Sequence, residues 1–390
     1  MCPAGHPLGF VSGMDYIRRY GGIRSFSTLR RCVSERPPDV VIPCDDGIVA
    51  QLHALHRQEP RLRDLIERSI GSPHGYSIVS SRYQLLNTAE ILGIRVPKTV
   101  RVRSAQDLVA WHQDNDCSSV LKVDGESGGN GVRISRSLEE SLAAWRELSM
   151  RPTAAQAWKR LAIDRHPLAT WMRSNLGDRE VTIQKFIVGR PANSMLVSRQ
   201  GAVLSQATVL VVASDGPTGA ATIIRYVNDR RMAQAGELLA AKLGSSGFYG
   251  LDFVIETETG NPYLIELNPR CTQLGHLGFA GNGSLAGALA ADLKGEPNRC
   301  LMRPIRPGSI ALFPQAFSDV AVRSPHLNTS HHDIPWDEPR LVRELMLEPW
   351  PTRRWAARLY HFFRPVSRLA PVEFEDAGPT FGSKRHRAVS

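Results

Sequence analysis

The sequence lacks the cysteine patterns that bind zinc or build a disulfide framework. Its six cysteines are scattered over 390 residues, and none forms a Cys-x-x-Cys pair: Cys2, Cys32, Cys44, Cys117, Cys271 and Cys300. Zinc sites and disulfide-rich domains have closely and regularly spaced cysteines. The spacing therefore argues against both, and it favours a reducing cytoplasm as the location of the chain.

Long apolar runs are also missing. The longest, Ala207 to Ala213, includes one threonine and has the length of a strand, whereas a membrane-spanning helix needs roughly 20 apolar residues. The first ten residues, MCPAGHPLGF, contain no basic stretch followed by an apolar one, as a secretory signal would. We therefore expect a soluble protein without a signal peptide or a transmembrane segment.

The bulk composition is that of an ordinary globular protein. Hydrophobic residues make up 42% and charged residues 22% of the chain, and its length suits two or three domains. The net charge of +10 favours acidic partners: nucleic acid, an anionic membrane surface or phosphorylated small molecules.

Three regions are expected along the chain. Residues 1–75 look like a partial α/β domain, in which Val40–Pro43 is a short buried strand and Gly47–His56 is the helix after it. No opening strand precedes them. Residues 76–315 contain most of the strand and helix patterns. Residues 316–390 form a C-terminal extension of prolines and basic helical pieces.

The most informative segment is residues 250–270, GLDFVIETETGNPYLIELNPR. Two apolar runs flank a Thr-Gly-Asn turn, which is typical of a β-hairpin. If the turn centres near Thr259, Asp252 lies opposite Glu266, and Asn268 falls two residues further along the same face.

Alternation along the strands gives these three polar residues apolar neighbours. It places Val254 and Leu264 on the same face and turns Ile265 to the other. Two carboxylates and an amide oxygen beside apolar side chains suit a hard cation such as Mg²⁺. A solvated hairpin face with scattered acids is the alternative, but that face would be mostly polar. The hairpin therefore predicts a magnesium site.

A second motif is the glycine-rich loop DGESGGNG at residues 124–131, which follows Lys122. Glycine lets backbone N–H groups turn towards phosphate oxygens, and a lysine adds positive charge. The loop leads into a strand and matches neither a Walker A loop nor a dinucleotide-binding fingerprint. On its own it is equally compatible with a flexible hairpin loop that binds nothing.

Taken together, the motifs resemble the ATP-grasp family. The lysine strand and glycine loop are followed about 60 residues later by VTIQKFIVG and then by the Asp…Glu-x-Asn hairpin. The resemblance covers about residues 80–312, and GLDFV…YLIELNPR…TQLGH is its most specific part. The pattern is similar to carboxylate–amine or carboxylate–thiol ligases, such as the ATP-binding domains of carbamoyl-phosphate synthase large chain and biotin carboxylase.

The resemblance implies an α/β fold. Its centre would be an α+β ATP-grasp core of two subdomains that clamp ATP, with a lid subdomain at about 119–187. An incomplete N-terminal Rossmann-like α/β domain and a basic helical C-terminal tail would flank this core. The Trp-rich segment at about 145–175 is longer than a minimal lid, and no function is assigned to it.

The resemblance also implies binding positions. Lys122 matches the lysine that contacts the α- and β-phosphates. Asp252, Glu266 and Asn268 match the ligands of Mg²⁺, for which Mn²⁺ is a substitute. Four glycines match the mobile loop that closes over the triphosphate: Gly125, Gly128, Gly129 and Gly131.

The segment VTIQKFIVG matches the hinge whose backbone groups read the adenine edge, through Gln184, Lys185 and Ile187. Many relatives carry an acidic residue just past the hinge to hold the ribose. Here GRPANS offers only Asn193, so ribose binding is not assigned.

Three arginines receive roles from the resemblance. Arg270, in the NPR triplet, would face the γ-phosphate or the acyl group, and with Lys122 it is the expected catalytic residue. Arg82 occupies the position of a first phosphate-binding residue, with a helix-surface charge as the equal alternative. Arg225 matches a phosphate-facing arginine in a looser alignment. His276 is left out of the catalytic set, because a lone histidine is more often structural.

The implied activity is that of an ADP-forming ligase. A carboxylate would be activated as an acyl phosphate and joined to an amine or thiol, giving a carbon–nitrogen or carbon–sulfur bond. The partners would be small molecules, a homodimer is compatible with the resemblance, and no nucleic-acid motif is present. The alternative is an ATP-binding module that ligates nothing. The missing opening strand favours this alternative and the intact acidic trio argues against it.

The C-terminal tail allows two interpretations. Residues 351–370 contain five arginines and no acid, with aromatic residues near helical spacing. Such a segment would make weak contact with an anionic surface or an acidic partner. We prefer the alternative, a terminal helix that packs its aromatic stripe on the domain.

Overall fold

The computed structural model describes residues 1–3, 6–14, 16–20, 24–115, 118–125, 131–150, 180–216, 219–279, 283–296, 308–317, 324–347 and 372–374. Three of the sequence-based expectations fall largely outside these ranges. They concern Gly128 and Gly129, most of the Trp-rich segment, and the basic tail at 351–370.

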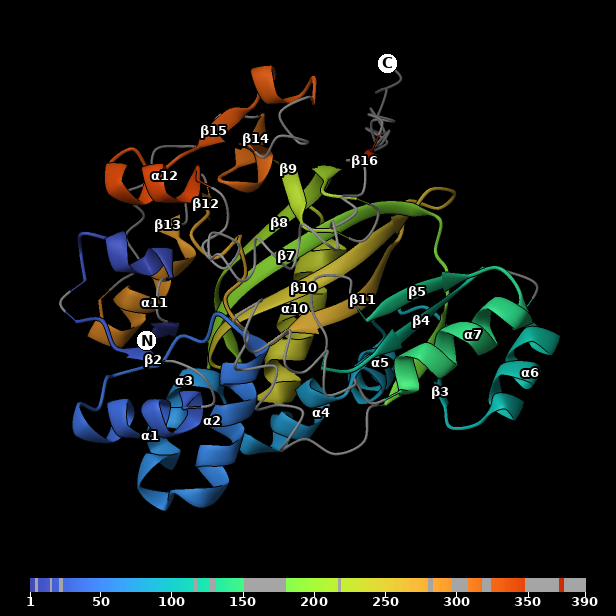
Figure 1. Ribbon diagram of the computed structural model, residues 1–390, viewed down its shortest axis with the longest axis horizontal. Helices are drawn as coiled ribbons and strands as arrows, with labels where there is room; N and C mark the ends of the chain where they lie inside the picture. Colours follow the sequence, from blue (N-terminus) through green and yellow to red (C-terminus); the bar gives the residue numbers. More distant parts are fainter. Residues whose placement is uncertain are drawn as a thin grey trace, which may run out of the picture.

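Helices and strands follow one another along the described chain (Figure 1). In chain order they are β1 (Cys2–Pro3), β2 (Arg19–Tyr20), α1 (Ser25–Glu35), α2 (Asp46–Gln58), α3 (Arg63–Ile70), α4 (Tyr76–Ser80), α5 (Arg82–Ile91), β3 (Thr99–Val102), α6 (Ala105–Asp114), β4 (Ser119–Val123), β5 (Val132–Ser135), α7 (Leu138–Ser149), β6 (Val181–Lys185), β7 (Gly189–Arg199), β8 (Ala202–Ser214), β9 (Ala221–Tyr226), α10 (Arg230–Leu243), β10 (Gly247–Glu256), β11 (Pro262–Asn268), β12 (Gly278–Phe279), β13 (Gly283–Ser284), α11 (Leu285–Lys294), β14 (Ser309–Leu312), β15 (His331–Asp333), α12 (Pro339–Leu345) and β16 (Val372–Glu373). Short 3₁₀ helices lie at Pro7–Phe10, Pro60–Leu62, Pro73–Gly75, Gln315–Phe317 and Leu327–Thr329.

The N-terminal region is mostly helical. Leu29 of α1, Leu52 and Leu55 of α2 and Ile66 of α3 pack into one buried cluster. The strands β1 and β2 pair in parallel over only two residues. The predicted helix after residue 46 is confirmed as α2.

The predicted strand at Val40–Pro43 is wrong. These residues are assigned to no strand, and their backbone bonds with a side chain and a distant loop instead of a sheet. The N–H of Val41 donates to Ser69 Oγ at 2.8 Å, and the carbonyl of Pro43 accepts from the N–H of Cys271 at 2.9 Å. An apolar run therefore reports burial, but it does not supply the neighbouring strand that a sheet needs.

A small antiparallel sheet has the strand order β3-β6-β4-β5. Helices α6 and α7 bury one of its faces, where Leu108 and Trp111 meet Leu121 and Ile183. Because side chains alternate along a strand, Lys122 points to the other face.

The large sheet has the order β11-β10-β7-β8-β9-β14-β15, with β16 beside β8. Helices α10 and α5 pack on one face, and α11 packs on the other (Figure 1). The turn at Arg199, Gln200 and Gly201 joins β7 to β8, and Gln200 and Gly201 both have positive φ.

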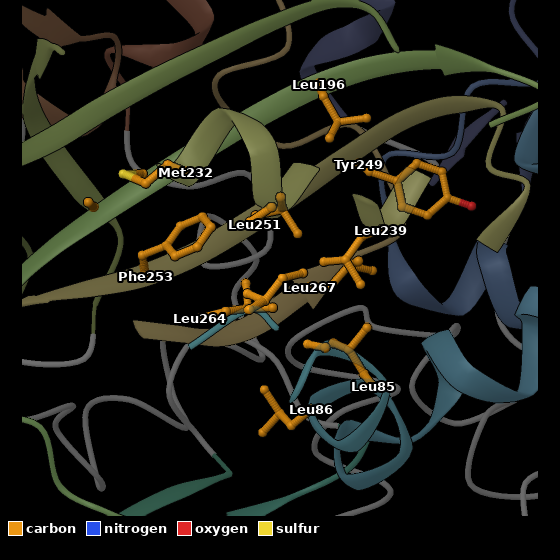
Figure 2. Close-up of a cluster of buried hydrophobic side chains, with 14 of the residues drawn as sticks. Leu85, Leu86, Leu196, Met232, Leu239, Tyr249, Leu251, Phe253, Leu264 and Leu267 are labelled. Carbon is orange, nitrogen blue, oxygen red and sulfur yellow. The ribbon is translucent and has the colours of Figure 1, made fainter. Parts of the chain in front are cut away.

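Helix α10 illustrates how local sequence sets an element. Asp229 caps its first turn by accepting from the N–H groups of Arg231 and Met232, and Gly244 ends it with φ +58°. Met232 and Leu239 lie on one stripe and meet Leu85 and Leu86 of α5 and the hairpin leucines in a single buried cluster (Figure 2).

Strands β10 and β11 form the hairpin predicted from the sequence. Asp252 pairs with Glu266, and Gly250 pairs with Asn268. Gly250 and Asp252 lie two residues apart on β10, so their partners Asn268 and Glu266 share the face of Asp252, as the alternation predicts.

Beyond that pair the register shifts, because Ile265 is an extra residue in β11. Phe253 pairs with Leu264 instead of Ile265, and Leu264 joins Leu251 and Phe253 in the core. The prediction that Leu264 shares the face of Asp252 is therefore wrong. The physical reason is a β-bulge, which inserts one residue and reverses the alternation after it.

Among the described helices, none combines the length and the apolar character needed to cross a bilayer.

Candidate functional site

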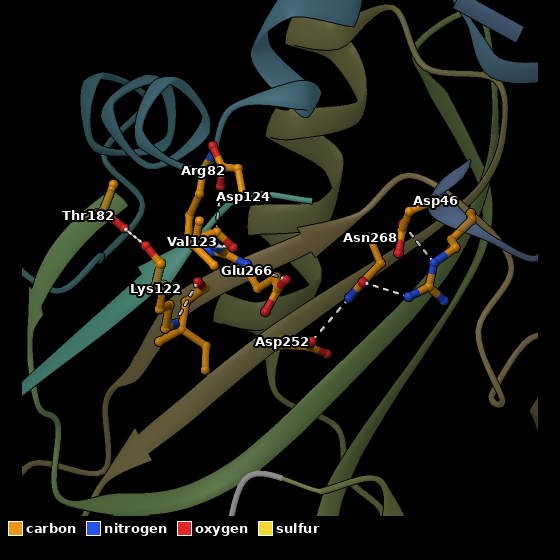
Figure 3. Close-up of polar contacts among 11 residues, drawn as sticks. Asp46, Arg82, Lys122, Val123, Asp124, Thr182, Asp252, Glu266 and Asn268 are labelled. Atoms are coloured by element: carbon orange, nitrogen blue, oxygen red, sulfur yellow. Dashed lines mark hydrogen bonds and ion pairs between the residues drawn. The ribbon is translucent and has the colours of Figure 1, made fainter. Parts of the chain in front are cut away.

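Charged side chains from four elements meet between the two sheets (Figure 3). Asp252 and Glu266 come from neighbouring strands of the large sheet, and Lys122 comes from β4 of the small one. Arg82 is the first residue of α5. Residues that are more than 180 positions apart in sequence, such as Arg82 and Glu266, bond directly.

Asp252 is held by two asparagine side chains. Asn193 Nδ2 on β7 donates to Asp252 Oδ1 at 2.6 Å, and Asn268 Nδ2 donates to Asp252 Oδ2 at 3.0 Å. Burial and the charge of Glu266 raise the pKa of Asp252 to about 6. The carboxylate is thus fixed in position, and the charge of Arg270 offsets only part of the rise in its pKa.

Glu266 has the opposite electrostatic setting. Burial alone would raise its pKa, but the charges of Arg82 and Lys122 outweigh burial and hold the pKa below its usual range. Arg82 Nη2 donates to Glu266 Oε1 at 2.7 Å. Glu266 is therefore ionised at neutral pH beside a carboxyl group that ionises less readily.

Arg82 joins the β10–β11 hairpin to the glycine loop. Its Nη1 lies 3.2 Å from Asp124 Oδ1, and its backbone N–H lies 3.3 Å from Asp124 Oδ2. The side chain is only 9% exposed, which rules out a helix-surface charge. Arg82 Nε is buried without a hydrogen-bond partner among the described residues, so one strong donor is available to an anion.

Lys122 is buried beneath the hairpin. Its Nζ lies 3.4 Å from the carbonyl of Ile265, the bulge residue, and its side chain is 5% exposed. Burial and the nearby charge of Arg82 lower its pKa to about 8. The negative charge of a bound phosphate would stabilise the ammonium form of this buried lysine.

Arg270 leaves the hairpin towards the N-terminal region. Its Nε donates to Asp46 Oδ1 at 2.8 Å, and its Nη2 donates to Asn268 Oδ1 at 3.2 Å. Asp46 is the first residue of α2, so this contact connects the β10–β11 hairpin to the helical N-terminal region (Figure 3).

The donor set fits a hard divalent cation with phosphate. Asp252 and Glu266 provide carboxylate oxygens, Asn268 provides an amide oxygen, and oxygen ligands are what Mg²⁺ prefers. Within the described part of the chain, no group of three or more His, Cys, Asp or Glu side chains could hold a metal. A cation bound here would therefore complete its coordination with water or ligand oxygens.

Backbone hydrogen bonds hold the base of the glycine loop on both sides. Gly125 has φ +78°, a conformation that glycine adopts without strain. The carbonyl of Gly131 accepts from the N–H of Val123 at 3.0 Å, and the N–H of Asp124 donates to the carbonyl of Glu180 at 3.1 Å. Gly128 and Gly129 lie outside the described residues.

The predicted hinge connects the two sheets. Strand β6 ends at Lys185 and β7 begins at Gly189. Gln184 Nε2 donates to Thr99 Oγ1 at 3.1 Å, and the N–H of Lys185 donates to the carbonyl of Lys98 at 2.9 Å. The Ile187 side chain is buried.

Arg225 is not brought to this cluster. Strand pairing places it in line with Leu210, Ala192 and Phe253. Directly paired residues share a face, so Arg225 lies on the face opposite Asp252 and three strands away.

Two residues of the site, Asp46 and Asp124, were not predicted from sequence, and neither was the supporting role of Asn193. Asn193 drew notice only as a weak ribose candidate. Its bond to Asp252 depends on the pairing of β7 with β10, and Asp46 and Asp124 meet their arginines through tertiary packing. A signal for Asp124 was its place directly before the first loop glycine.

Comparison with known proteins gives a domain match and several structural likenesses. Residues 168–273 match the ATP-grasp domain family, and no curated protein matches the chain. The fold is similar to carboxyaminoimidazole ribonucleotide synthase from Aspergillus clavatus complexed with ATP, with a TM-score of 0.55 and 15% identity over 78% of this chain and 72% of that chain.

Two further structures were compared. N5-carboxyaminoimidazole synthetase from Staphylococcus aureus, complexed with ADP, has a TM-score of 0.52 and 13% identity over 79% of this chain and 73% of that chain. A biotin carboxylase from Campylobacter jejuni aligns with a TM-score of 0.47 and 13% identity over 63% of this chain. The chain spans 52% of the length of that carboxylase.

Proposed function

We propose that this chain, an ATP-grasp protein by its fold and by the domain match at residues 168–273, binds ATP with Mg²⁺ and acts as an ADP-forming ligase. It would join a small-molecule carboxylate to an amine or thiol. The structural relatives named above were solved with ATP or ADP, which supports the nucleotide part of this proposal.

The single observation that carries the proposal is the paired carboxylates of Asp252 and Glu266, with cationic side chains from two other elements beside them. Arg82 contacts Glu266 at 2.7 Å, and Lys122 lies under the same hairpin. Phosphoryl transfer needs positioning and charge neutralisation more than covalent chemistry, and this cluster provides both.

Each residue of the cluster would have a separate role. Asp252, Glu266 and Asn268 would hold Mg²⁺, which supplies charge neutralisation at the phosphates when bound. Arg82 and Lys122 would hold phosphate oxygens. Arg270 would hold the substrate carboxylate while it attacks the γ-phosphorus, and would stabilise the oxyanion formed when the amine or thiol displaces phosphate.

Nucleotide binding requires Arg82 to change partners. In the structure described above its Nη2 occupies Glu266 Oε1, an oxygen that the cation also needs. We infer that a phosphate draws Arg82 away from Glu266, while Asp124 keeps the guanidinium near the loop. The unpartnered Nε of Arg82 is the donor with which this exchange would begin.

The remaining parts follow the domain plan. The loop from Gly125 to Gly131 would close over the triphosphate and exclude water. The hinge at Gln184, Lys185 and Ile187 would hold adenine. Arg225 is left out of the proposal, because it lies on the opposite face of the sheet.

The test is ADP release from MgATP with a panel of carboxylate and amine or thiol pairs. Glu266→Gln keeps the shape of the side chain and should lower ADP formation by about a hundredfold or more, the scale expected when a charge-stabilising group is lost. Glu258→Gln, in the exposed turn of the same hairpin, is the matched control and should behave as wild type. ADP formation by Glu266→Gln at the wild-type rate would refute the metal-site assignment.

A further inference from the structure

Two cysteines that are remote in sequence meet beside the candidate site. The thiols of Cys44 and Cys271 lie close enough for each to shift the pKa of the other. Cys44 Sγ also lies 3.9 Å from the carbonyl of Ile42, and Cys271 Sγ lies 3.6 Å from the carbonyl of Thr272. The backbones of the same two segments are joined as well, because the N–H of Cys271 donates to the carbonyl of Pro43 at 2.9 Å. The contact therefore belongs to a fixed junction between segments.

The surroundings make room for sulfur and leave one thiol accessible. Cys44 is exposed and Cys271 is half-buried. A Cβ added to Gly275 would lie 2.1 Å from Cys271 Sγ, so only glycine leaves space for this sulfur. An accessible thiol next to a sheltered one is the arrangement of a reactive cysteine and its resolving partner.

The electrostatics separate the roles of the two thiols. The neighbouring Cys271 thiol and the charge of Arg270 lower the pKa of Cys44 to about 7, although burial opposes this. The neighbouring Cys44 thiol and burial raise the pKa of Cys271. Cys44 is thus the member of the pair that carries the thiolate, which is the reactive form.

We propose that Cys44 and Cys271 form a dithiol modification site that a peroxide oxidises to a reversible disulfide. The geometry that carries the proposal is the backbone bond between Pro43 and Cys271, which brings the two cysteines side by side, and the accessibility of Cys44. Cytosolic disulfides are rare and mostly redox-sensing, so this pair is compatible with a reducing compartment.

The reaction balances with hydrogen peroxide as the oxidant. The Cys44 thiolate attacks one peroxide oxygen, the O–O bond breaks, and hydroxide leaves, which gives a sulfenic acid. The Cys271 sulfur then attacks the Cys44 sulfur, the S–O bond breaks, and the thiol proton leaves with the hydroxyl as water. Two thiols are oxidised to one disulfide, and one peroxide is reduced to two water molecules.

Oxidation would reach the candidate site through chain neighbours. Cys44 lies two residues before Asp46, Cys271 follows Arg270, and Arg270 donates to Asp46 at 2.8 Å. A Cys44–Cys271 disulfide would lock these segments together and hold Arg270 on Asp46, away from a substrate carboxylate. This consequence rests on the proposed function, whereas the disulfide itself does not.

The experiment counts thiols in the full-length chain after hydrogen peroxide treatment, using maleimide labelling and peptide mass spectrometry. We expect loss of two of the six thiols, a linked peptide containing Cys44 and Cys271, and full recovery with dithiothreitol. Cys32→Ser is the matched control and should lose the same pair. Cys271→Ser should stop at a sulfenic acid on Cys44, captured by dimedone.

Two results would overturn the proposal. One is a Cys271 thiol that stays fully labelled in wild type while Cys44 is oxidised to sulfinic acid. The other is a disulfide that joins either cysteine to a different one or to a second chain. Neither readout uses nucleotide, so the thiol count does not depend on the ligase proposal. Failure of one proposal can therefore be told apart from failure of the other.

Discussion

At the scale of single residues, Arg82 balances the charges of the candidate site. One guanidinium, 9% exposed, serves both Asp124 and Glu266. Removing one partner from a buried ion pair leaves an uncompensated charge, which costs far more than the pair itself contributes. The pKa of Asp124 is already raised to about 6 by burial, even with Arg82 in place.

Replacement of Arg82 therefore tests this balance. Arg82→Ala should lower the free energy of unfolding by about 3–5 kcal/mol, measured by urea denaturation at neutral pH. Arg133→Ala is the control, because Arg133 pairs with Glu147 at 2.5 Å on the surface and exposed pairs contribute about 0–1 kcal/mol. Equal losses in the two variants would contradict a buried, charge-balancing role for Arg82.

The two carboxylates of the candidate site could be predicted from sequence better than the residues that support them. Asp252 and Glu266 were placed opposite each other from the turn position alone, and β10 and β11 confirm that pairing. Asp124 and Asp46 were missed, because each meets an arginine through packing of distant elements. Strand periodicity contains no information about such contacts.

At the scale of elements, the start of β7 beside β10 in the large sheet depends on one glycine. Gly189 begins β7, and a Cβ added there would lie 2.1 Å from the carbonyl oxygen of Ile255 on β10. The close approach lets β7 pair with β10 along ten successive residues. This pairing also brings Asn193 next to Asp252.

A methyl group at this position should be poorly tolerated. Gly189→Ala should destabilise the fold by about 1–3 kcal/mol or more, the usual cost of overpacking, as measured by chemical denaturation. Gly13→Ala is the matched control, because a Cβ there meets nothing within 4 Å. A Gly189→Ala protein as stable as Gly13→Ala would show that β7 and β10 can separate at no cost.

Elements were predicted well where a pattern was long and badly where it was short or irregular. The hairpin within residues 250–270 and the helix after residue 46 were confirmed. The four-residue strand at Val40–Pro43 was wrong, because its apolar residues are anchored by Ser69 and Cys271 instead of by a strand. The bulge at Ile265 was also missed, since an inserted residue leaves no mark in the apolar pattern.

At the scale of the whole molecule, the predicted α/β class and the resemblance to the ATP-grasp family are confirmed by the fold and by the domain match. The glycine loop after Lys122, the hinge and the hairpin, in this order, were sufficient to indicate the resemblance. Sequence identity to the solved structures is only 13–15%. The division at residues 75 and 315 stays a prediction. The substrates cannot be read from the chain, because the groups that would select them come from several elements.

The buried His53 should affect how the free energy of unfolding depends on pH. Burial and the charges of Arg57 and His56 lower its pKa to about 4, and its ring stacks on Tyr76 at 4.1 Å. The unfolded chain takes up a proton near pH 6.5, whereas the folded chain resists it down to about pH 4. His53 therefore destabilises the fold as the pH falls through this window, by about 3 kcal/mol in total.

The measurement compares variants, because Asp124 and Asp252 act in the opposite direction. Their pKa values are raised to about 6, so their contribution to stability grows as the pH falls. The unfolding free energy of His53→Phe should decrease less than that of wild type between pH 6.5 and pH 4. His331→Gln, on the surface, should follow wild type, and parallel curves for all three proteins would contradict a neutral buried His53.

The most direct measurement is the thermal unfolding midpoint with Mg²⁺ alone, ATP alone and both together. A ligand that binds only the folded state stabilises it by about 2.7 kcal/mol at a hundredfold excess over its dissociation constant, which shifts the midpoint by a few degrees. We predict a shift with both ligands that exceeds the sum of the separate shifts, is retained in Glu258→Gln and is lost in Glu266→Gln. No shift in wild type, or an equal shift in Glu266→Gln, would contradict a MgATP site at Asp252, Glu266 and Asn268.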